Sequence, residues 1–162
     1  MTFNLLVWLF AVSITIHNLE EAIWLPGWEP NICRLKIKTG PLEFRFAVSV
    51  LTLLAYLAAT LAMIGGRGSV GAYLISGYAL AMLINVFVPH LLATIITKRY
   101  APGTATAIVL NLPVTILLLR QGFREGVIDT STFLTAGPLS ALGILLLLPI
   151  LFFIGRRIRP SS

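Results

Sequence analysis

Five long apolar stretches, separated by short breaks rich in glycine, proline and charged residues, dominate the pattern of hydrophobic and polar positions along the chain. A transmembrane α-helix needs about 20 predominantly apolar residues. Each stretch comes near this length, and the breaks hold residues that end helices, such as Pro26-Gly27 and Ala101-Pro102-Gly103. The pattern predicts five membrane-spanning helices, at residues 3–25, 44–64, 71–96, 104–119 and 133–154.

Composition points to a membrane protein built as one domain. Of the 162 residues, 57% are hydrophobic and 11% are charged, and the mean hydropathy is +0.93. A soluble domain of this size shows more charge to water. The first apolar stretch has no basic residue before it and no small-residue cleavage site after it, so we expect a retained helix rather than a signal peptide. We therefore expect an all-α, polytopic transmembrane helical bundle in the cell membrane, with residues 1–162 in a single domain.

The twelve basic residues are divided unevenly between the two sides of this bundle. With the amino-terminus outside and the carboxy-terminus in the cytoplasm, only Arg67, Arg120 and Arg124 lie outside, which is the bias that the positive-inside rule describes. The other nine then face anionic membrane lipid, and no exposed stretch interleaves basic and aromatic residues, so nucleic-acid binding is not expected. The nine are Arg34, Lys36, Lys38, Arg45, Lys98, Arg99, Arg156, Arg157 and Arg159.

Three ionisable side chains, His17, Glu20 and Glu21, interrupt the first apolar stretch. On a helix they stand at i, i+3 and i+4, so they point into one arc of about 100°. Each costs about 2.5 to 3.5 kcal/mol near the centre of a spanning helix, so such residues are candidates for function. The carboxylates also face the negative end of the helix dipole and need a positive partner. A metal ion, Arg34, Arg45 or a protonated histidine could supply it.

Polar residues of other spans are expected near the same depth. His17 and His90 each lie eight residues before the predicted cytoplasmic end of their helix, which at 1.5 Å per residue places both about 12 Å from that end. Asn111 lies nine residues after the break that precedes the fourth span, and we interpret it as a hydrogen-bonding link between helices. Glu43 and Arg45 open the second span from the same side, either as part of a site or as an interfacial ion pair.

Pro89 is expected to bend the third span. It has no N–H to donate to the carbonyl group of Asn85, so the helix should kink and leave that carbonyl free beside the asparagine amide. Asn85 and His90 are about 140° apart on an ideal helix. Only a kink or a wide pocket would let both line one cavity.

Four short segments together resemble the bacterial membrane-protein family that is named for its HXXEE motif. The resemblance covers roughly residues 5–125. That family is defined by its motif rather than by an established activity, so the resemblance supports the choice of residues and implies no reaction. The segments are His17-Asn18-Leu19-Glu20-Glu21, Phe44-Arg45-Phe46-Ala47-Val48, Asn85-Val86-Phe87-Val88-Pro89-His90 and Tyr100-Ala101-Pro102-Gly103.

Our first hypothesis is a membrane-embedded, metal-dependent hydrolase that acts on a lipid-like or other hydrophobic small-molecule substrate. The order H-x-x-E-E partly matches the inverted zincin motif H-x-x-E-H. His17, Glu21 and His90 would bind a divalent ion, zinc first, with iron or manganese also suited to a carboxylate-rich site. Glu20 would act as the general base on a metal-bound water, with His17 and His90 at the reacting centre. Residues lining the site would be Asn85, Glu43, Arg45 and Asn111.

Two alternatives stay open. Without a metal, His17 and Glu20 would serve as general acid and base in an isomerase or cyclase of a lipid-like substrate. A small proton-coupled transporter would use the same residues as a relay. Five spans show no internal inverted repeat, so a transporter would need a homodimer to supply its second half.

Overall fold

The computed structural model describes residues 1–28 and 40–158, and all regular structure in these residues is helical. Short irregular turns, one 3₁₀ and two π-helical, interrupt or end several of the helices. The elements are α1 (Phe3–Trp24), η1 (Leu25–Gly27), α2 (Pro41–Gly65), α3 (Val70–Asn85), η2 (Val86–Leu91), α4 (Leu92–Thr97), α5 (Thr104–Thr106), η3 (Ala107–Asn111), α6 (Leu112–Arg124) and α7 (Thr130–Ile158).

Five helical segments in this part of the chain are long and apolar enough to cross a membrane, which confirms the predicted all-helical fold and the number of helices able to span. They extend beyond the predicted limits by up to five residues, most at the end of the fourth. Hydropathy marks only the apolar part of a helix, whereas the backbone continues helical through polar residues such as Arg120 and Arg124. The segments are Phe3–Gly27, Pro41–Gly65, Val70–Thr97, Thr104–Arg124 and Thr130–Ile158.

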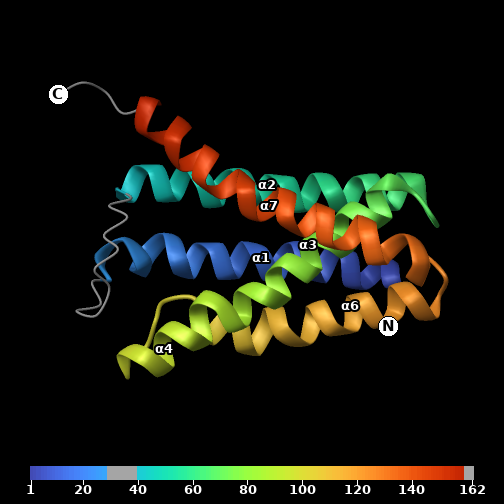
Figure 1. Ribbon diagram of the computed structural model, residues 1–162, viewed down its shortest axis with the longest axis horizontal. Coiled ribbons are helices and arrows are strands. Elements are labelled where there is room, and N and C mark those ends of the chain that lie inside the picture. The colour runs from blue at the N-terminus through green and yellow to red at the C-terminus, as the bar shows by residue number, and fades with distance from the viewer. Residues whose placement is uncertain (29–39, 159–162) are drawn as a thin grey trace.

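The helices form an elongated bundle in which α1 lies between α2 and α6 and contacts both, while α3 and α7 cross them obliquely (Figure 1). The start of α1, the turn between α2 and α3, and the connection from α6 to α7 lie at one end, called here the amino-terminal end (Figure 1). The last turn of α1, the start of α2 and all of α4 lie at the opposite end, called the α4 end. The last turns of α7 lie toward the α4 end as well.

Apolar packing is concentrated toward the amino-terminal end. Phe3, Leu6, Val7 and Phe10 of α1 belong to one buried cluster with small and large residues of α2 and α3. Small residues let helices approach closely. The resulting van der Waals contacts hold helices together in lipid, where the hydrophobic effect does not. At Gly71 the approach is so close that an added Cβ would lie 2.3 Å from the carbonyl carbon of Leu61.

The other half of α1 buries polar residues, and one of them fixes the helix on α2. The Asn18 amide donates to the Thr52 hydroxyl at 2.8 Å and to the Val48 carbonyl at 3.2 Å. Buried amide groups without partners are costly, so these bonds favour one rotation of α1 about its axis. That rotation turns the face with His17 and Glu21 away from α2, toward η2 and α5.

The kink expected at Pro89 is present. The π-helical turn η2 contains Val88 with φ −134° and ψ 112°, outside the helical region. The chain then reverses between α4 and α5 through Lys98 and Gly103, which adopt left-handed φ angles of 52° and 91°. This reversal brings the first turn of the fourth span against η2 and the second half of α1.

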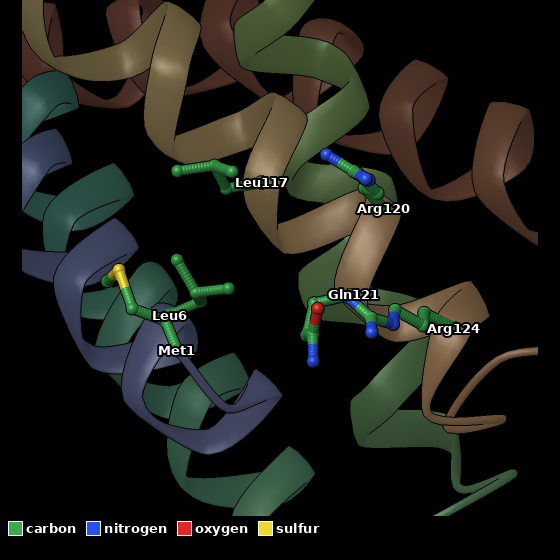
Figure 2. Close-up of a pocket in the computed structure, with 6 residues that line it drawn as sticks. All are labelled: Met1, Leu6, Leu117, Arg120, Gln121 and Arg124. Carbon is green, nitrogen blue, oxygen red and sulfur yellow. The ribbon is translucent and has the colours of Figure 1, made fainter.

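A hollow of about 210 Å³ lies near the amino-terminal end, between the start of α1 and the last turns of α6 (Figure 2). Two arginines, a glutamine and apolar side chains line it, with neither histidine nor carboxylate among them. Its lining therefore offers none of the predicted metal ligands. The residues are Met1, Leu6, Leu117, Arg120, Gln121 and Arg124 (Figure 2).

Candidate metal centre

His17, Glu21 and His90 form a group whose potential metal-binding atoms all lie within 4.8 Å of one another. The Oε1 atom of Glu21 is 3.2 Å from Nε2 of His90 and 3.9 Å from Nε2 of His17. The two imidazole rings meet edge to face, with centroids 4.9 Å apart. Both histidines are buried, and Glu21 is 12% exposed. The approach of His17 and His90 expected from their equal depth is thus present.

Two local features bring this group together. His17 and Glu21 stand one turn apart on α1, and the kinked turn η2 supplies His90 from the third span. Gly103 closes the group from the loop that follows α4. A Cβ on this glycine would lie 2.5 Å from Cε1 of His90 and 3.0 Å from Cγ of Glu21. The backbone therefore lies directly against both side chains, in a left-handed conformation that favours glycine.

The group fits a divalent metal ion in its chemistry and its spacing. Zn–N and Zn–O bonds of about 2.0 to 2.1 Å in a tetrahedron put neighbouring ligand atoms about 3.3 Å apart. The separation between His90 and Glu21 is already close to this value, and that between His17 and Glu21 needs a small side-chain movement. Two histidines and a glutamate are also the ligands of one class of catalytic zinc site, which keeps a fourth position open.

One atom of the group lacks a hydrogen-bond partner. Within the described residues, Nε2 of His90 is buried and has none, although Glu21 lies 3.2 Å away. Buried polar atoms are nearly always satisfied, so an unsatisfied one at a potential ligand position calls for an explanation. Coordination of an ion would satisfy it.

Glu20 is oriented differently from its neighbour Glu21. Its carboxylate accepts hydrogen bonds from the hydroxyl of Tyr100, from the backbone N–H groups of Gly103 and Thr106 at 2.9 and 3.3 Å, and from the Thr106 hydroxyl at 2.7 Å. All these donors belong to the chain reversal and the first turn of the fourth span. Glu20 thus anchors that turn to α1, and its predicted role as a general base stays a prediction.

Tyr100 lies outside the five spans and takes part in this anchor. Its hydroxyl donates to Glu20 and accepts from the backbone N–H of Ala105 at 3.1 Å. Partial burial raises the pKa of the Tyr100 phenol, and the hydrogen bond to Glu20 raises it further. The hydroxyl therefore keeps its proton, and with it the bond to Glu20, at neutral pH.

Asn111 and Asn85 were predicted to line the site, and that role stays a prediction. Asn111 accepts a hydrogen bond of 2.5 Å from the Ser13 hydroxyl, one turn from His17, and so joins two helices as interpreted from the sequence. The Asn85 side-chain oxygen is buried, with no hydrogen-bond partner among the described residues.

Glu43 and Arg45, the other predicted lining residues, have contacts at the start of α2. Arg45 donates to the carbonyl oxygen of Ala22 at 3.2 Å, at the end of α1, and therefore does not pair with the motif carboxylates. Glu43 is buried near Gly155 of α7. The ion pair suggested for Glu43 and Arg45 is absent from the part of the chain that the structure describes. Arg34, the other suggested partner, lies outside that part.

The sequence did not identify Thr106 as part of the site, nor Tyr100 and Gly103 as partners of Glu20. A signal was present, because the first turn of a helix has free N–H groups that favour a carboxylate, and the fourth span begins directly after Gly103. Nothing in the sequence, however, indicates that the carboxylate is the Glu20 side chain, more than 80 residues away.

A hollow of about 440 Å³ borders this site at the α4 end of the bundle. Glu20 and the aromatic rings of three other residues contribute to its walls, so it combines one charged group with apolar surface. Such a hollow suits an amphiphilic molecule. It is lined by Glu20, Trp24, Gly27, Trp28, Tyr100 and Pro102.

Comparison with known sequences identifies a family. The family described as "Protein of unknown function with HXXEE motif" matches residues 8–118. The chain is 36% identical over 151 residues to "Uncharacterized protein YrkK" of Bacillus subtilis (strain 168), covering 93% of this chain and 96% of that protein. No solved structure matches. The matched region contains all three residues of the candidate metal group, and Glu20, Tyr100, Gly103 and Thr106 of the adjoining anchor. The chain belongs to this HXXEE family.

Proposed function

We propose that this protein is a membrane-embedded, metal-dependent enzyme that binds a divalent ion through His17, Glu21 and His90. The observation that carries the proposal is the buried, unsatisfied Nε2 of His90, which faces Glu21 in a group that also contains His17. Zinc is the first candidate for this ligand set, with iron or manganese next.

The proposed reaction is hydrolysis of a lipid-like or other hydrophobic substrate. A bound divalent ion would supply a water of lowered pKa and polarise an oxygen of the substrate. The hollow beside Glu20 would admit the polar end of the substrate, and Trp24, Trp28 and Tyr100 would contact its apolar part. Both carboxylate oxygens of Glu20 accept hydrogen bonds. At least one of these hydrogen bonds would have to break before Glu20 could accept a proton.

We place the site in the cytoplasmic half of the cell membrane, with the amino-terminus outside. Five of the nine basic residues belong to the α4 end, where the proposed site lies (Figure 1): Arg45 near the start of α2, Lys98 and Arg99 directly after α4, and Arg156 and Arg157 in the last turns of α7. An excess of basic residues marks cytoplasmic loops, so their position supports this orientation. Arg34, Lys36, Lys38 and Arg159 lie outside the described residues.

Elemental analysis of the purified protein tests the proposal. We expect about one divalent ion per chain in the wild type. The metal content should fall strongly in His17→Ala and Glu21→Ala, because each residue that binds the ion directly contributes much of the binding free energy. Glu43→Ala is the matched control, since it removes another carboxylate outside the metal group. Full occupancy in His17→Ala would refute the metal site. A metal-free wild type would support acid–base catalysis or transport by the same residues.

A further inference from the structure

The hydroxyl group of Thr106 lies between the imidazole of His17 and the carboxylate of Glu20. Its Oγ1 atom is 2.9 Å from Nδ1 of His17, 2.7 Å from Oε2 of Glu20 and 3.2 Å from the carbonyl oxygen of Gly103. A hydroxyl has one hydrogen to donate and two lone pairs, whereas carbonyl and carboxylate oxygens only accept. The donor and acceptor roles in the series of hydrogen bonds from Glu20 through Thr106 to His17 therefore follow from which neighbour receives that one hydrogen.

The hydrogen points to Glu20. Tyr100, the two backbone N–H groups and Thr106 surround this carboxyl group with donors, and within the described residues every hydrogen-bond partner of Glu20 is a donor. That environment fits an ionised carboxylate, and a hydrogen bond from a hydroxyl to a carboxylate is short and stronger than a neutral one. The Thr106 oxygen consequently presents a lone pair to His17.

Nδ1 of His17 must then carry a hydrogen. If Nδ1 presented a lone pair instead, two acceptors would face each other at 2.9 Å in a buried site, and one hydrogen bond would be lost. A neutral imidazole has a hydrogen on only one nitrogen. The free lone pair of His17 therefore stands on Nε2, the atom that faces Glu21.

We propose that Glu20 and Thr106 are positioning residues that hold His17 in the tautomer with hydrogen on Nδ1, which leaves Nε2 free to bind the ion. Metal-binding histidines commonly donate their second ring nitrogen to a partner that fixes the tautomer. The inference deepens the proposed function and rests on it for the ion. The tautomer itself is a property of the metal-free protein.

The proposal gives the two adjacent glutamates of the motif different tasks. Glu21 binds the ion, whereas Glu20 does not bind it and orients the ligand His17 through Thr106. A purely structural role for Thr106, closing the first turn of the fourth span, would leave the tautomer of His17 unchanged when the hydroxyl is removed. The tautomer therefore separates the two roles.

Nitrogen NMR of histidine-labelled, metal-free protein in detergent measures the tautomer directly. The chain has only two histidines, so a His90→Gln variant assigns the signals. In the wild type we expect a protonated Nδ1 and an unprotonated Nε2 on His17. Thr106→Val, which keeps the shape and removes the hydroxyl, should shift His17 toward the other tautomer, and Thr106→Ser should restore the wild-type pattern.

Thr115→Val provides a matched control. Thr115 is a buried threonine of the same span, and its hydroxyl donates only to backbone carbonyl groups of Asn111 and Leu112. The Thr115→Val variant should leave both the tautomer of His17 and the affinity for zinc unchanged. Zinc titrations supply the second measurement, with an affinity loss of about 10-fold to 100-fold in Thr106→Val and Glu20→Gln.

The possible outcomes separate this proposal from the proposed function. A hydrogen on Nε2 of His17 in the wild type overturns the proposal without any variant. An unchanged His17 tautomer in a folded Thr106→Val protein overturns it as well, even when the wild type binds zinc and the metal site stands. A wild type with the expected tautomer but no bound ion in any preparation refutes the metal site. The role of Glu20 and Thr106 is then only to orient His17.

Discussion

Replacing Gly103 by alanine tests how closely the chain reversal packs on the histidine group. The backbone there has φ +91°, and a left-handed conformation costs an L-residue about 1 to 2 kcal/mol. The added Cβ would also lie 2.5 Å from Cε1 of His90, compared with an optimum of about 3.5 to 4.0 Å between carbon atoms. The ring must therefore move by about 1 Å, which displaces its Nε2 from Glu21.

Gly126→Ala is the control for backbone strain. Gly126 has φ +64°, and no atom of the described residues lies within 4 Å of its Cβ position. We expect each variant to lose about 1 to 2 kcal/mol of stability from the backbone, and Gly103→Ala to lose about 1 to 3 kcal/mol more from overpacking. Only Gly103→Ala should lower zinc affinity, by about 10-fold or more.

Thermal unfolding followed by circular dichroism in detergent measures the stability loss, and competition with a zinc-binding dye measures affinity. Wild-type zinc affinity in a folded Gly103→Ala protein would refute the close packing inferred at His90. An equal loss of affinity in Gly126→Ala would show that general destabilisation, rather than displacement of the ring, weakens the site.

Two further predictions concern topology and pH. A cysteine placed at Ser162, in a chain without Cys33, should resist an impermeant thiol reagent added to intact cells, whereas Arg67→Cys should react; the reverse labelling would invert the orientation. Hydrogen bonds from Ser131, and then Tyr73, hold the pKa of exposed Asp129 below its ordinary value of 3.8. Because the folded pKa is the lower one, this stabilisation is complete above 3.8 and is lost as pH falls through the folded value. The Tm difference between the wild type and Asp129→Asn should thus stay constant from about pH 7 to 5 and shrink in stronger acid; a difference that changes across the neutral range would contradict this assignment.

The spans and the approach of the two histidines could be predicted from the sequence. They depend on local hydrophobicity and on the number of residues between each histidine and the end of its helix. Apolar length marks each helix, and residue counts from the breaks give depth along the bundle. His17 and His90 therefore met as expected, although the sequence shows neither the 87° ring angle nor the unsatisfied Nε2. Both depend on the backbone at Val88 and Gly103, which depth alone does not determine.

The lining residues were less predictable, because depth does not define the direction in which a side chain points. Asn111 was expected near the depth of His17 as a link between helices, and its link is to Ser13, one turn along α1. Arg45 was a candidate partner for the motif carboxylates and instead reaches the carbonyl group of Ala22. A free backbone carbonyl at a helix end attracts a cation as the carboxylates do, so residue type alone could not separate the two partners.

The different environments of Glu20 and Glu21 follow from the geometry of one helix. Consecutive residues point about 100° apart, so the carboxylates of two adjacent glutamates on one helix reach different partners. Glu21 points toward His90 of η2, and Glu20 toward the first turn of the fourth span, where it accepts from Gly103 and Thr106. His17, one turn earlier, touches both sides through its two ring nitrogens. In an H-x-x-E-E order, the second glutamate can thus bind an ion together with the histidine, while the first orients the imidazole through a series of hydrogen bonds. A single glutamate could not do both.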